Sequence, residues 1–337
     1  MQDAPSNPSD VEIIDRLRIA REKLKDQIAR VIVGQEEVVD KVLIALFCQG
    51  HSLMIGVPGL AKTLLVKTIS RILHLKFQRI QFTPDLMPSD IIGTEVIEDS
   101  METGRREFRF IRGPIFANII LADEINRTPP KTQAALLEAM EEHEVTAGGE
   151  THHLDEPFFV LATQNPIEQE GTYPLPEAQL DRFMFNIHLT YPDRESEEEI
   201  VRRTTAGEQF ELDPVLDSAE VIDIQQVVRK IPASGAMISY AVNLVARTRP
   251  MDSSAPEFVR NWIRWGAGPR ASQYLILGAK ARSVLRGNYF VSTEDIQAVA
   301  HEVLGHRIVT NFQAESEGVT PRDIIQRLLD ETQPPSG

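Results

Sequence analysis

Only one cysteine, Cys48, occurs among the 337 residues, so neither an internal disulfide nor a zinc site made of several cysteines can form. Cys48 follows the apolar run 42–47, and we expect its small side chain in the buried core. No apolar run approaches the length of a membrane span, and the polar first ten residues lack the features of a secretory signal. We therefore expect a cytoplasmic protein without a membrane span.

Positive charge is also scarce, because 35 Lys and Arg stand against 50 Asp and Glu, which gives a formal net charge of -15. This balance disfavours nucleic acid or an anionic membrane as the partner. Residues 105–112 do interleave basic and aromatic side chains, as single-strand-binding surfaces do. Against the overall charge, we interpret this strip as a solvated hairpin that contacts a neighbouring subunit or a protein client.

A histidine metal site is not indicated. His143, His152 and His153 lie near Asp155, but they have neither a cysteine nor a helical ligand spacing. We expect them to be surface histidines.

Short apolar runs separated by helical patterns predict strands buried on both faces of a parallel sheet, with helices as crossovers. These runs span 52–56, 77–82, 118–123, 158–163 and 184–189. Two further stretches, 94–114 and 144–154, predict hairpins inserted into the connections, the second with Gly148 and Gly149 at its turn. From about Pro192 onward the pattern is helical.

The predicted organisation is an α/β nucleotide-binding domain followed by a smaller all-α lid domain. We expect a three-layer parallel-sheet domain over 11–191, the lid over 192–330, and disordered tails at 1–10 and 331–337.

Residues 56–63, Gly-Val-Pro-Gly-Leu-Ala-Lys-Thr, follow the first predicted strand and open a helix, which is the context of a phosphate-binding loop. Backbone N–H groups there can wrap phosphates, Lys62 can reach the β and γ phosphates of ATP, and Thr63 can ligate Mg²⁺. Ala61 stands where the general pattern has glycine, which is acceptable if Ala61 has right-handed helical angles. The predicted cofactors are ATP and Mg²⁺. The loop residues expected to bind ATP are Val57, Pro58, Gly59, Leu60, Ala61, Lys62, Thr63 and Leu64.

Two carboxylates, Asp123 and Glu124, follow the strand predicted at 118–122. Asp123 suits the magnesium shell and Glu124 suits polarisation of the attacking water. Alone, such a pair is more often a solvated strand end or a helix cap, but the upstream phosphate loop favours the catalytic interpretation. Asn165 follows the strand predicted at 158–163 and can orient the water or contact the γ phosphate, although asparagine before proline is also an ordinary turn signal.

Two arginines complete the candidate set. Arg182 lies in Leu-Asp-Arg-Phe before the last predicted strand, and Arg270 lies in Gly-Pro-Arg-Ala within the helical region. An arginine placed against developing phosphoryl charge accelerates transfer strongly. Most arginines are instead surface or salt-bridge residues, so these two roles depend on the family resemblance.

Together these segments resemble the MoxR family of AAA+ ATPases over nearly the whole chain from about residue 31. The resemblance implies that Val33 and Gly34 contact adenine and that alanine at position 61 is the family's own form. It implies that Asp123 and Glu124 are the Walker B acids and that Asn165 is the sensor-one residue. It further implies that Arg182 is an arginine finger and Arg270 the sensor-two residue.

The resemblance also implies a homo-oligomer, typically a hexameric ring, that acts as a chaperone-like remodeller or maturation factor for a protein client. Frequent partners of the family carry a von Willebrand factor A domain. This sequence has no Asp-x-Ser-x-Ser motif after Pro192, so such a partner is expected to be another polypeptide. The two hairpins correspond to inserts that usually face the ring pore or the client.

Three alternatives remain open at this point. The chain could be the ATPase subunit of a magnesium chelatase, which shares this arrangement. It could be a nucleic-acid motor, in which Arg105, Arg106 and Arg109 bind single strands. It could also be a switch in which ATP binding organises a scaffold and turnover is incidental.

Overall fold

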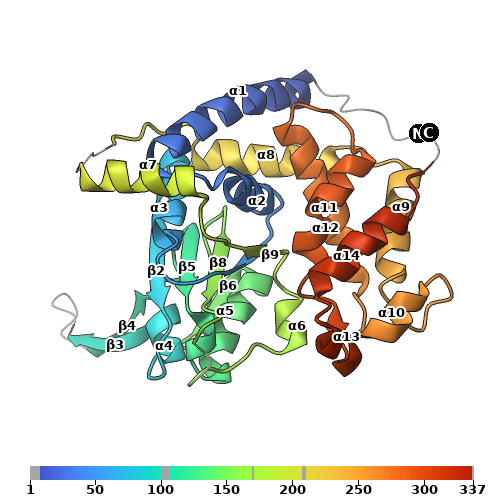
Figure 1. Ribbon diagram of the computed structural model, residues 1–337. Coiled ribbons are helices and arrows are strands. Elements are labelled where there is room, and N and C mark those ends of the chain that lie inside the picture. Colours follow the sequence, from blue (N-terminus) through green and yellow to red (C-terminus); the bar gives the residue numbers. More distant parts are fainter. Residues whose placement is uncertain (1–7, 100–105, 169–170, 207–209, 336–337) are drawn as a thin grey trace.

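The computed structural model describes residues 8–99, 106–168, 171–206 and 210–335 (Figure 1). Its main sheet has five parallel strands in the order β2-β5-β8-β1-β9. The strands are β1 (Ser52–Ile55), β2 (Phe77–Gln81), β5 (Ile119–Asp123), β8 (Phe159–Gln164) and β9 (Phe185–His188). Each coincides with a predicted apolar run to within about two residues. The predicted parallel α/β fold is confirmed.

Alternate side chains of the central strands enter two separate cores, which makes the domain three-layered. On β5, Ile119 and Leu121 belong to one core, whereas Ile120 and Ala122 belong to the other. The first core is covered by α2 (Glu36–Phe47) and α3 (Lys62–Ile72), with α1 (Pro8–Val31) packed behind them. The second is covered by α4 (Pro88–Ile92) and α5 (Pro130–Glu142).

Both predicted hairpins are present. They are formed by β3 (Gly93–Asp99) with β4 (Arg106–Arg112), and by β6 (Glu144–Ala147) with β7 (Glu150–His153). The rings of Phe110 on β4 and His152 on β7 stack with centroids 4.3 Å apart, so the hairpins pack against each other. His153 is exposed, but His143 and His152 are half-buried, so the expectation of three surface histidines is wrong for these two.

The C-terminal region is mainly helical. Its helices are α7 (Arg194–Thr205), α8 (Ser218–Lys230), α9 (Gly235–Ala246), α10 (Glu257–Trp262), α11 (Pro269–Leu285), α12 (Thr293–Leu304), α13 (Phe312–Glu317) and α14 (Pro321–Glu331). A short antiparallel pair, β10 (Ile263–Trp265) and β11 (Val309–Thr310), was not predicted. The first helix, α7, lies over α3 and α1, where Arg203 donates to the carbonyls of Ala29 and Arg30 (Figure 1).

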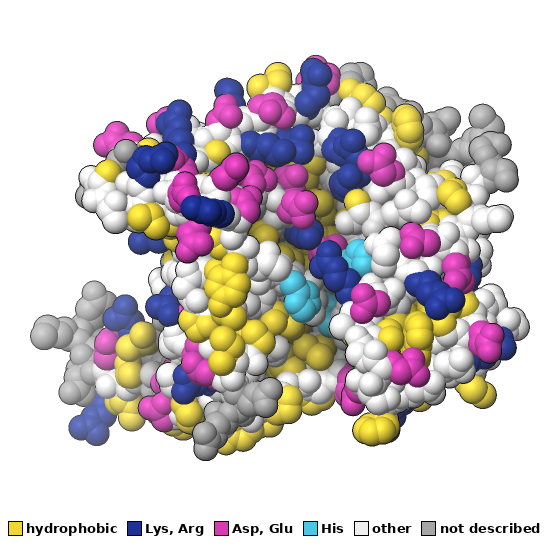
Figure 2. Space-filling view, in the orientation of Figure 1, with side chains coloured by type: hydrophobic (Ala, Val, Ile, Leu, Met, Phe, Trp, Pro, Cys, Tyr) yellow, Lys and Arg dark blue, Asp and Glu magenta, His cyan; other side chains and the backbone are white. Residues whose placement is uncertain are grey.

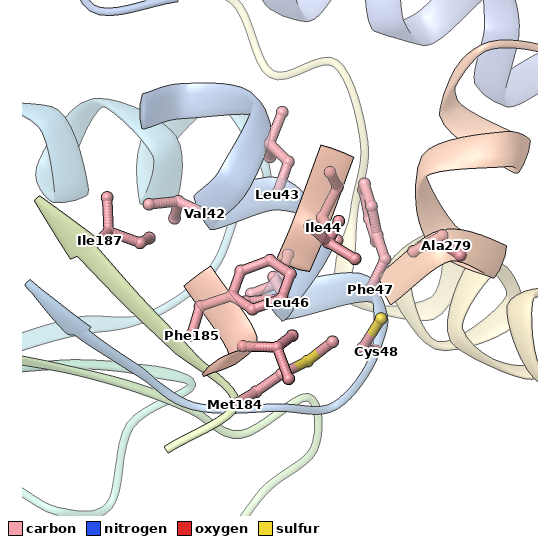
Figure 3. Close-up of a cluster of buried hydrophobic side chains, with 14 of the residues drawn as sticks. Val42, Leu43, Ile44, Leu46, Phe47, Cys48, Met184, Phe185, Ile187 and Ala279 are labelled. Carbon is pink, nitrogen blue, oxygen red and sulfur yellow. The ribbon is translucent and has the colours of Figure 1, made fainter. Parts of the chain in front are cut away.

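The sheet domain and the helical region share one continuous core. Phe47 on α2 and Phe185 on β9 are fully buried in the cluster around Ala279 of α11 (Figure 3). Burial of each such side chain contributes about 1.5–3 kcal/mol. Cys48 lies in the same cluster as expected, and burial raises the pKa of its thiol, so it is a packing residue.

A cleft is bordered by α2, α11, α12 and α14, and charged side chains of both signs line it, among them Lys41, Glu302 and Arg322. Figure 2 shows this face of the molecule, hollowed between its two lobes. Lys41 and Glu302 form an ion pair of 2.7 Å that joins α2 to α12. None of the described helices is both long and apolar enough to cross a membrane.

The predicted tails fall partly outside the described residues, since 1–7 and 336–337 are not described. Glu331, which we assigned to the second tail, is the last residue of α14. Residues 8–10, which we assigned to the first tail, belong to α1. Arg105, a member of the basic strip, also lies outside the described residues.

Candidate active site

The predicted phosphate loop connects β1 to α3. No described atom lies within 4 Å of the position that a Cβ would take at Gly59, so the loop borders open space there. The helix α3 begins at Lys62, and its first N–H groups have no partner within the helix itself. Such an N-terminus is suited to bind an anion.

Ala61 has φ 55° and ψ 24°, in the left-handed region. The expectation of right-handed angles is therefore wrong. An alanine in this conformation costs about 1–2 kcal/mol, which explains why glycine is the general residue here. Its carbonyl still accepts from the N–H of Leu65, so it starts the helix.

The Lys62 ammonium donates to the carbonyl oxygen of Gly56 at the base of the loop. Burial lowers the pKa of Lys62, while the nearby carboxylates of Asp123 and Glu124 oppose this shift. The lysine is thus folded over the loop, close to the acidic pair, and must exchange the Gly56 carbonyl for a phosphate oxygen when a nucleotide binds.

Asp123 is the last residue of β5, and Thr163 on the adjacent strand β8 fixes its side chain. The Thr163 hydroxyl donates to Oδ1 of Asp123 at 2.6 Å and accepts from the N–H of Glu124 at 2.9 Å. Oδ2 of Asp123 accepts from Arg79, with Nη2 at 2.6 Å. Oxygen donors such as Asp123 and Thr63 suit Mg²⁺, but Asp123 must release Arg79 to bind a metal directly.

Glu124 adopts left-handed backbone angles, φ 58° and ψ 50°, immediately after the strand. Its Oε2 accepts from Nε2 of Gln81 at 3.1 Å and pairs with Nη1 of Arg127 at 3.3 Å. Both partners fix the position of the carboxylate, and a carboxylate at this position is suited to accept a proton from water.

Asn165 follows β8 and is 6% exposed. Its Oδ1 accepts from the N–H of Ile167, whereas its buried Nδ2 has no hydrogen-bond partner in the described part of the chain. Leaving a buried amide donor unpaired costs about 1–3 kcal/mol, so a ligand oxygen that accepts from Nδ2 recovers that cost.

Parallel pairing brings these groups to one edge of the sheet, because β1, β8 and β5 are neighbours and all end there. The predicted adenine-binding segment is also adjacent, since Gln35 donates to the carbonyl of Leu60 at 3.2 Å. Gly34, beside it, has φ 71° and lies against Ser196 of α7, where a Cβ would come within 2.5 Å of the Ser196 hydroxyl.

The two arginines lie at the opposite edge of the sheet. Arg182 precedes β9, whose first residue, Phe185, pairs with Ser52, the first residue of β1, whereas the phosphate loop follows the last residue of β1. Four strand residues separate the two edges, a distance of about 13 Å. Arg182 therefore does not approach the phosphate loop of its own chain, and Arg270 lies beside Arg182.

Both arginines pair with one acid, Glu141, at the end of α5. Nη2 of Arg182 lies 2.9 Å from one Glu141 oxygen, and Nη2 of Arg270 lies 3.2 Å from the other. Nη1 of Arg270 also lies 3.4 Å from Asp181. The three side chains border a small cavity near Gly50 and Tyr274.

Several residues that hold the predicted ones in place were not predicted from the sequence: Arg79, Gln81, Arg127 and Thr163. Arg79 and Gln81 could have been found from the strand order alone, because β2 ends beside β5. Thr163 carries no motif signal, since a threonine is common in any buried strand.

Comparison with known proteins agrees with this architecture. Residues 51–185 match the family model described as ATPase family associated with various cellular activities (AAA), and residues 258–328 match the AAA lid domain. Chaperone MoxR1 of Mycobacterium tuberculosis is 43% identical over 303 residues, which cover 90% of this chain and 79% of that protein. Protein YeaC of Bacillus subtilis is 41% identical over 308 residues, covering 91% and 92%, and Protein MoxR of Methylorubrum extorquens is 28% identical over 342, covering 96% and 97%.

A crystal structure from Cytophaga hutchinsonii, of a protein provisionally named as an ATPase, superposes with a TM-score of 0.88 at 44% identity. The match covers 96% of this chain and 97% of that chain.

Proposed function

This chain belongs to the MoxR family of AAA+ ATPases, and from that premise we propose that it binds ATP with Mg²⁺ and hydrolyses it in a ring of identical subunits that remodels a protein client. One observation carries the catalytic part. The phosphate loop, the Asp123–Glu124 pair and the unpaired amide of Asn165 meet at one edge of the sheet.

Each group at this edge has a distinct task. The loop N–H groups and Lys62 bind the phosphates, and Val33 and Gly34 border the base. Thr63 and Asp123 are the oxygen donors for Mg²⁺, which neutralises phosphate charge. Glu124 polarises the attacking water, and Nδ2 of Asn165 donates to that water or to the γ phosphate.

Both acids have cationic or amide partners within the chain. Asp123 is paired with Arg79, and Glu124 is shared by Gln81 and Arg127. Phosphate oxygens attract Arg79 and Arg127 away from the carboxylates, so nucleotide binding itself releases the catalytic groups.

The position of the arginines supports an oligomer. Arg182 and Arg270 lie about the length of one strand from their own phosphate loop, so they can serve only the loop of another subunit. A contact between two different faces of the same chain is heterologous and closes into a ring when the rotation allows it. We take the ring to be a hexamer, as is typical of the family.

The client-binding surface that we propose is the β3–β4 hairpin. Ile97 and Phe108 are cross-strand partners and are 59% and 72% exposed, which gives an apolar pair on a projecting element (Figure 1). The name of the relative Chaperone MoxR1 supports a protein client. A von Willebrand factor A domain protein is the partner that we propose, with the cytoplasm as the location.

No observation favours a nucleic-acid motor. Within the described part of the basic strip, Arg109 pairs with Glu98 at 3.2 Å, and Arg112 lies over the ring of Phe116 at 4.8 Å. These two side chains are engaged within the protein, and the net charge opposes a polyanion.

The test is phosphate release from ATP and Mg²⁺ by purified wild-type protein, Glu124→Gln and a control, Glu37→Gln, which changes an exposed acid on α2. We expect turnover by the wild type and the control, and loss of turnover with retained ATP binding in Glu124→Gln. A wild type without turnover, or turnover that survives Glu124→Gln, refutes hydrolysis at this site.

The same variant also identifies the client. Glu124→Gln loaded with ATP should hold a protein in a pull-down from native extract, whereas Lys62→Ala should not. Recovery of nucleic acid alone, or of nothing above the Lys62→Ala control, contradicts the remodelling function.

A further inference from the structure

Arg307, just after α12, is a buried cation to which the proposed chemistry assigns no role. Its side chain is 2% exposed. Nε donates to Oδ1 of Asp181 at 2.7 Å, and Nη2 donates to the carbonyls of Asp181 and Phe183 at 2.8 and 2.7 Å. Nη1 donates to the carbonyls of Met184 at 3.3 Å and Val303 at 2.5 Å.

Apart from the bond to Val303 on α12, these bonds converge on the short turn 181–184 between α6 (Glu177–Leu180) and β9, which contains Arg182. Three of its four backbone carbonyls thus accept from a lid residue. The fourth, that of Arg182, lies 3.5 Å from the hydroxyl of Tyr274, another lid residue, whose ring faces the Arg307 guanidinium. The lid therefore contacts every backbone carbonyl of the turn that carries Arg182, whereas the N–H groups of the turn donate within the sheet domain.

Arg307 also determines the position of Arg270 through Asp181. The carboxylate of Asp181 is divided between them, with Oδ1 bound to Arg307 and Oδ2 lying 3.4 Å from Nη1 of Arg270. A buried guanidinium whose N–H groups are hydrogen-bonded is held in one orientation. Its removal leaves the carbonyls and an oxygen of the Asp181 carboxylate without that partner. Arg182 and Arg270 are thereby tied to a single buried side chain.

We propose that Arg307 is a positioning residue that sets Arg182 and Arg270 for the phosphate loop of the neighbouring subunit, and so couples the lid of one subunit to hydrolysis at the next. The proposal rests on the proposed ATPase ring. It requires that a substitution of Arg307 disturb Arg182 and Arg270 and leave the phosphate loop at the opposite edge of the sheet unchanged.

The direct test is hydrogen–deuterium exchange of wild type and Arg307→Lys, which keeps the charge but cannot make the forked contacts. We expect the amides of 181–184 to exchange at least about tenfold faster, with those of α3 unchanged. The control, Arg282→Lys, makes the same change at an arginine that pairs with buried Asp295 inside the lid, and it should leave 181–184 protected. Unchanged exchange at 181–184 in Arg307→Lys overturns the proposal, whether or not the wild type hydrolyses ATP.

The functional test uses the separation of the phosphate loop and the two arginines at opposite edges of the sheet. Arg307→Lys should lower kcat by about 10- to 100-fold with unchanged ATP affinity, because the arginines are displaced while the loop is intact. The variant Lys62→Ala has a defective loop but intact arginines. In a 1:1 mixture of the two variants, about one quarter of the contacts between neighbouring subunits combine an intact loop from one subunit with intact arginines from the other.

Activity of the mixture should therefore exceed the mean of the two separate variants. A purely structural defect in Arg307→Lys would not be rescued in this way. Loss of ATP binding by Arg307→Lys, or a mixture no more active than that mean, overturns the proposal. Absence of turnover in the wild type would instead refute the ATPase assignment, and the exchange measurement decides the positioning role independently.

Discussion

Arg182 and Arg270 come from the sheet domain and the lid, yet they bind the two oxygens of one carboxylate, that of Glu141. In the free chain, Glu141 occupies the groups that we propose for the neighbour's phosphates. The three side chains are 33–41% exposed, so solvent weakens these pairs. A phosphate with several negative charges should therefore displace Glu141 at small cost.

Replacement of Glu141 by glutamine should have a small effect and in the direction of activation. The two competing pairs are worth about 0.5 kcal/mol each, so we expect kcat/KM to rise by about fivefold. Arg182→Ala and Arg270→Ala should instead lower kcat by about 10³-fold. Steady-state ATPase assays of the three variants check this, and a large loss in Glu141→Gln would contradict the competition that we infer.

Gln81→Ala should raise basal hydrolysis, because Gln81 holds the Glu124 carboxylate by a hydrogen bond of 3.1 Å. A hydrogen bond to a charged group is worth about 1.5–3 kcal/mol, but Arg127 remains to hold Glu124. We therefore expect an increase of severalfold rather than the full effect of that bond. Gln78→Ala, three residues earlier on the same strand, is the control. An unchanged or lower rate in Gln81→Ala would mean that Gln81 aligns Glu124 rather than restrains it.

Thr163→Val should impair stability and catalysis together. Valine keeps the shape but leaves the Glu124 N–H and an Asp123 oxygen without their partner, at a cost of about 1–3 kcal/mol. Thr163→Ser retains the hydroxyl and should behave nearly as wild type. Thermal unfolding and ATPase rates measured on both variants make the comparison, and equal behaviour of the two would show that the hydroxyl is dispensable.

His51 predicts a pH dependence of stability. Burial, the largest cause, lowers its pKa to about 4 in the folded chain. An unfolded histidine titrates near 6.5, so between about pH 6.5 and pH 4 the unfolded state binds the extra proton. The contribution of His51 to stability is complete above pH 6.5 and is lost as pH falls, by about 3 kcal/mol at most.

This is measured as the free energy of unfolding across that pH range for wild type and His51→Gln. The other buried histidines, such as His306, titrate in both proteins, so the difference between the two curves isolates His51. Parallel curves would assign the pH dependence to other groups.

The parts of the site predictable from sequence are those whose signal is local. The phosphate loop and Asp123–Glu124 each follow an apolar run, and the direction of that run places them at a strand end. Ala61 shows the limit of this reasoning, because its left-handed angles depend on closing the loop between β1 and α3 and cannot be inferred from residue type.

The contacts between distant segments could not be predicted. Thr163, Glu141 and Arg307 act on residues between 39 and 129 positions away in the chain, through the strand order and the docking of the lid. Nothing in their neighbouring sequence marks them, since each is an ordinary residue of a strand or a helix end. The reason why each of these positions needs its particular side chain becomes clear only when the oxygen or N–H group that it binds is located in the structure.

Glu141, which pairs with both arginines, lies in the last turn of α5, three residues before β6 begins. The β6–β7 hairpin in turn stacks on the β3–β4 hairpin through Phe110 and His152. The short segment between Glu141 and β6 therefore connects the contact that we propose between subunits to the two hairpins, one of which carries Ile97 and Phe108. In the ring that we propose, a neighbour's phosphate that draws the arginines away from Glu141 would change the restraint at the start of the β6–β7 hairpin. Through the Phe110–His152 stack, the proposed nucleotide site would thereby be coupled to the proposed client-binding surface.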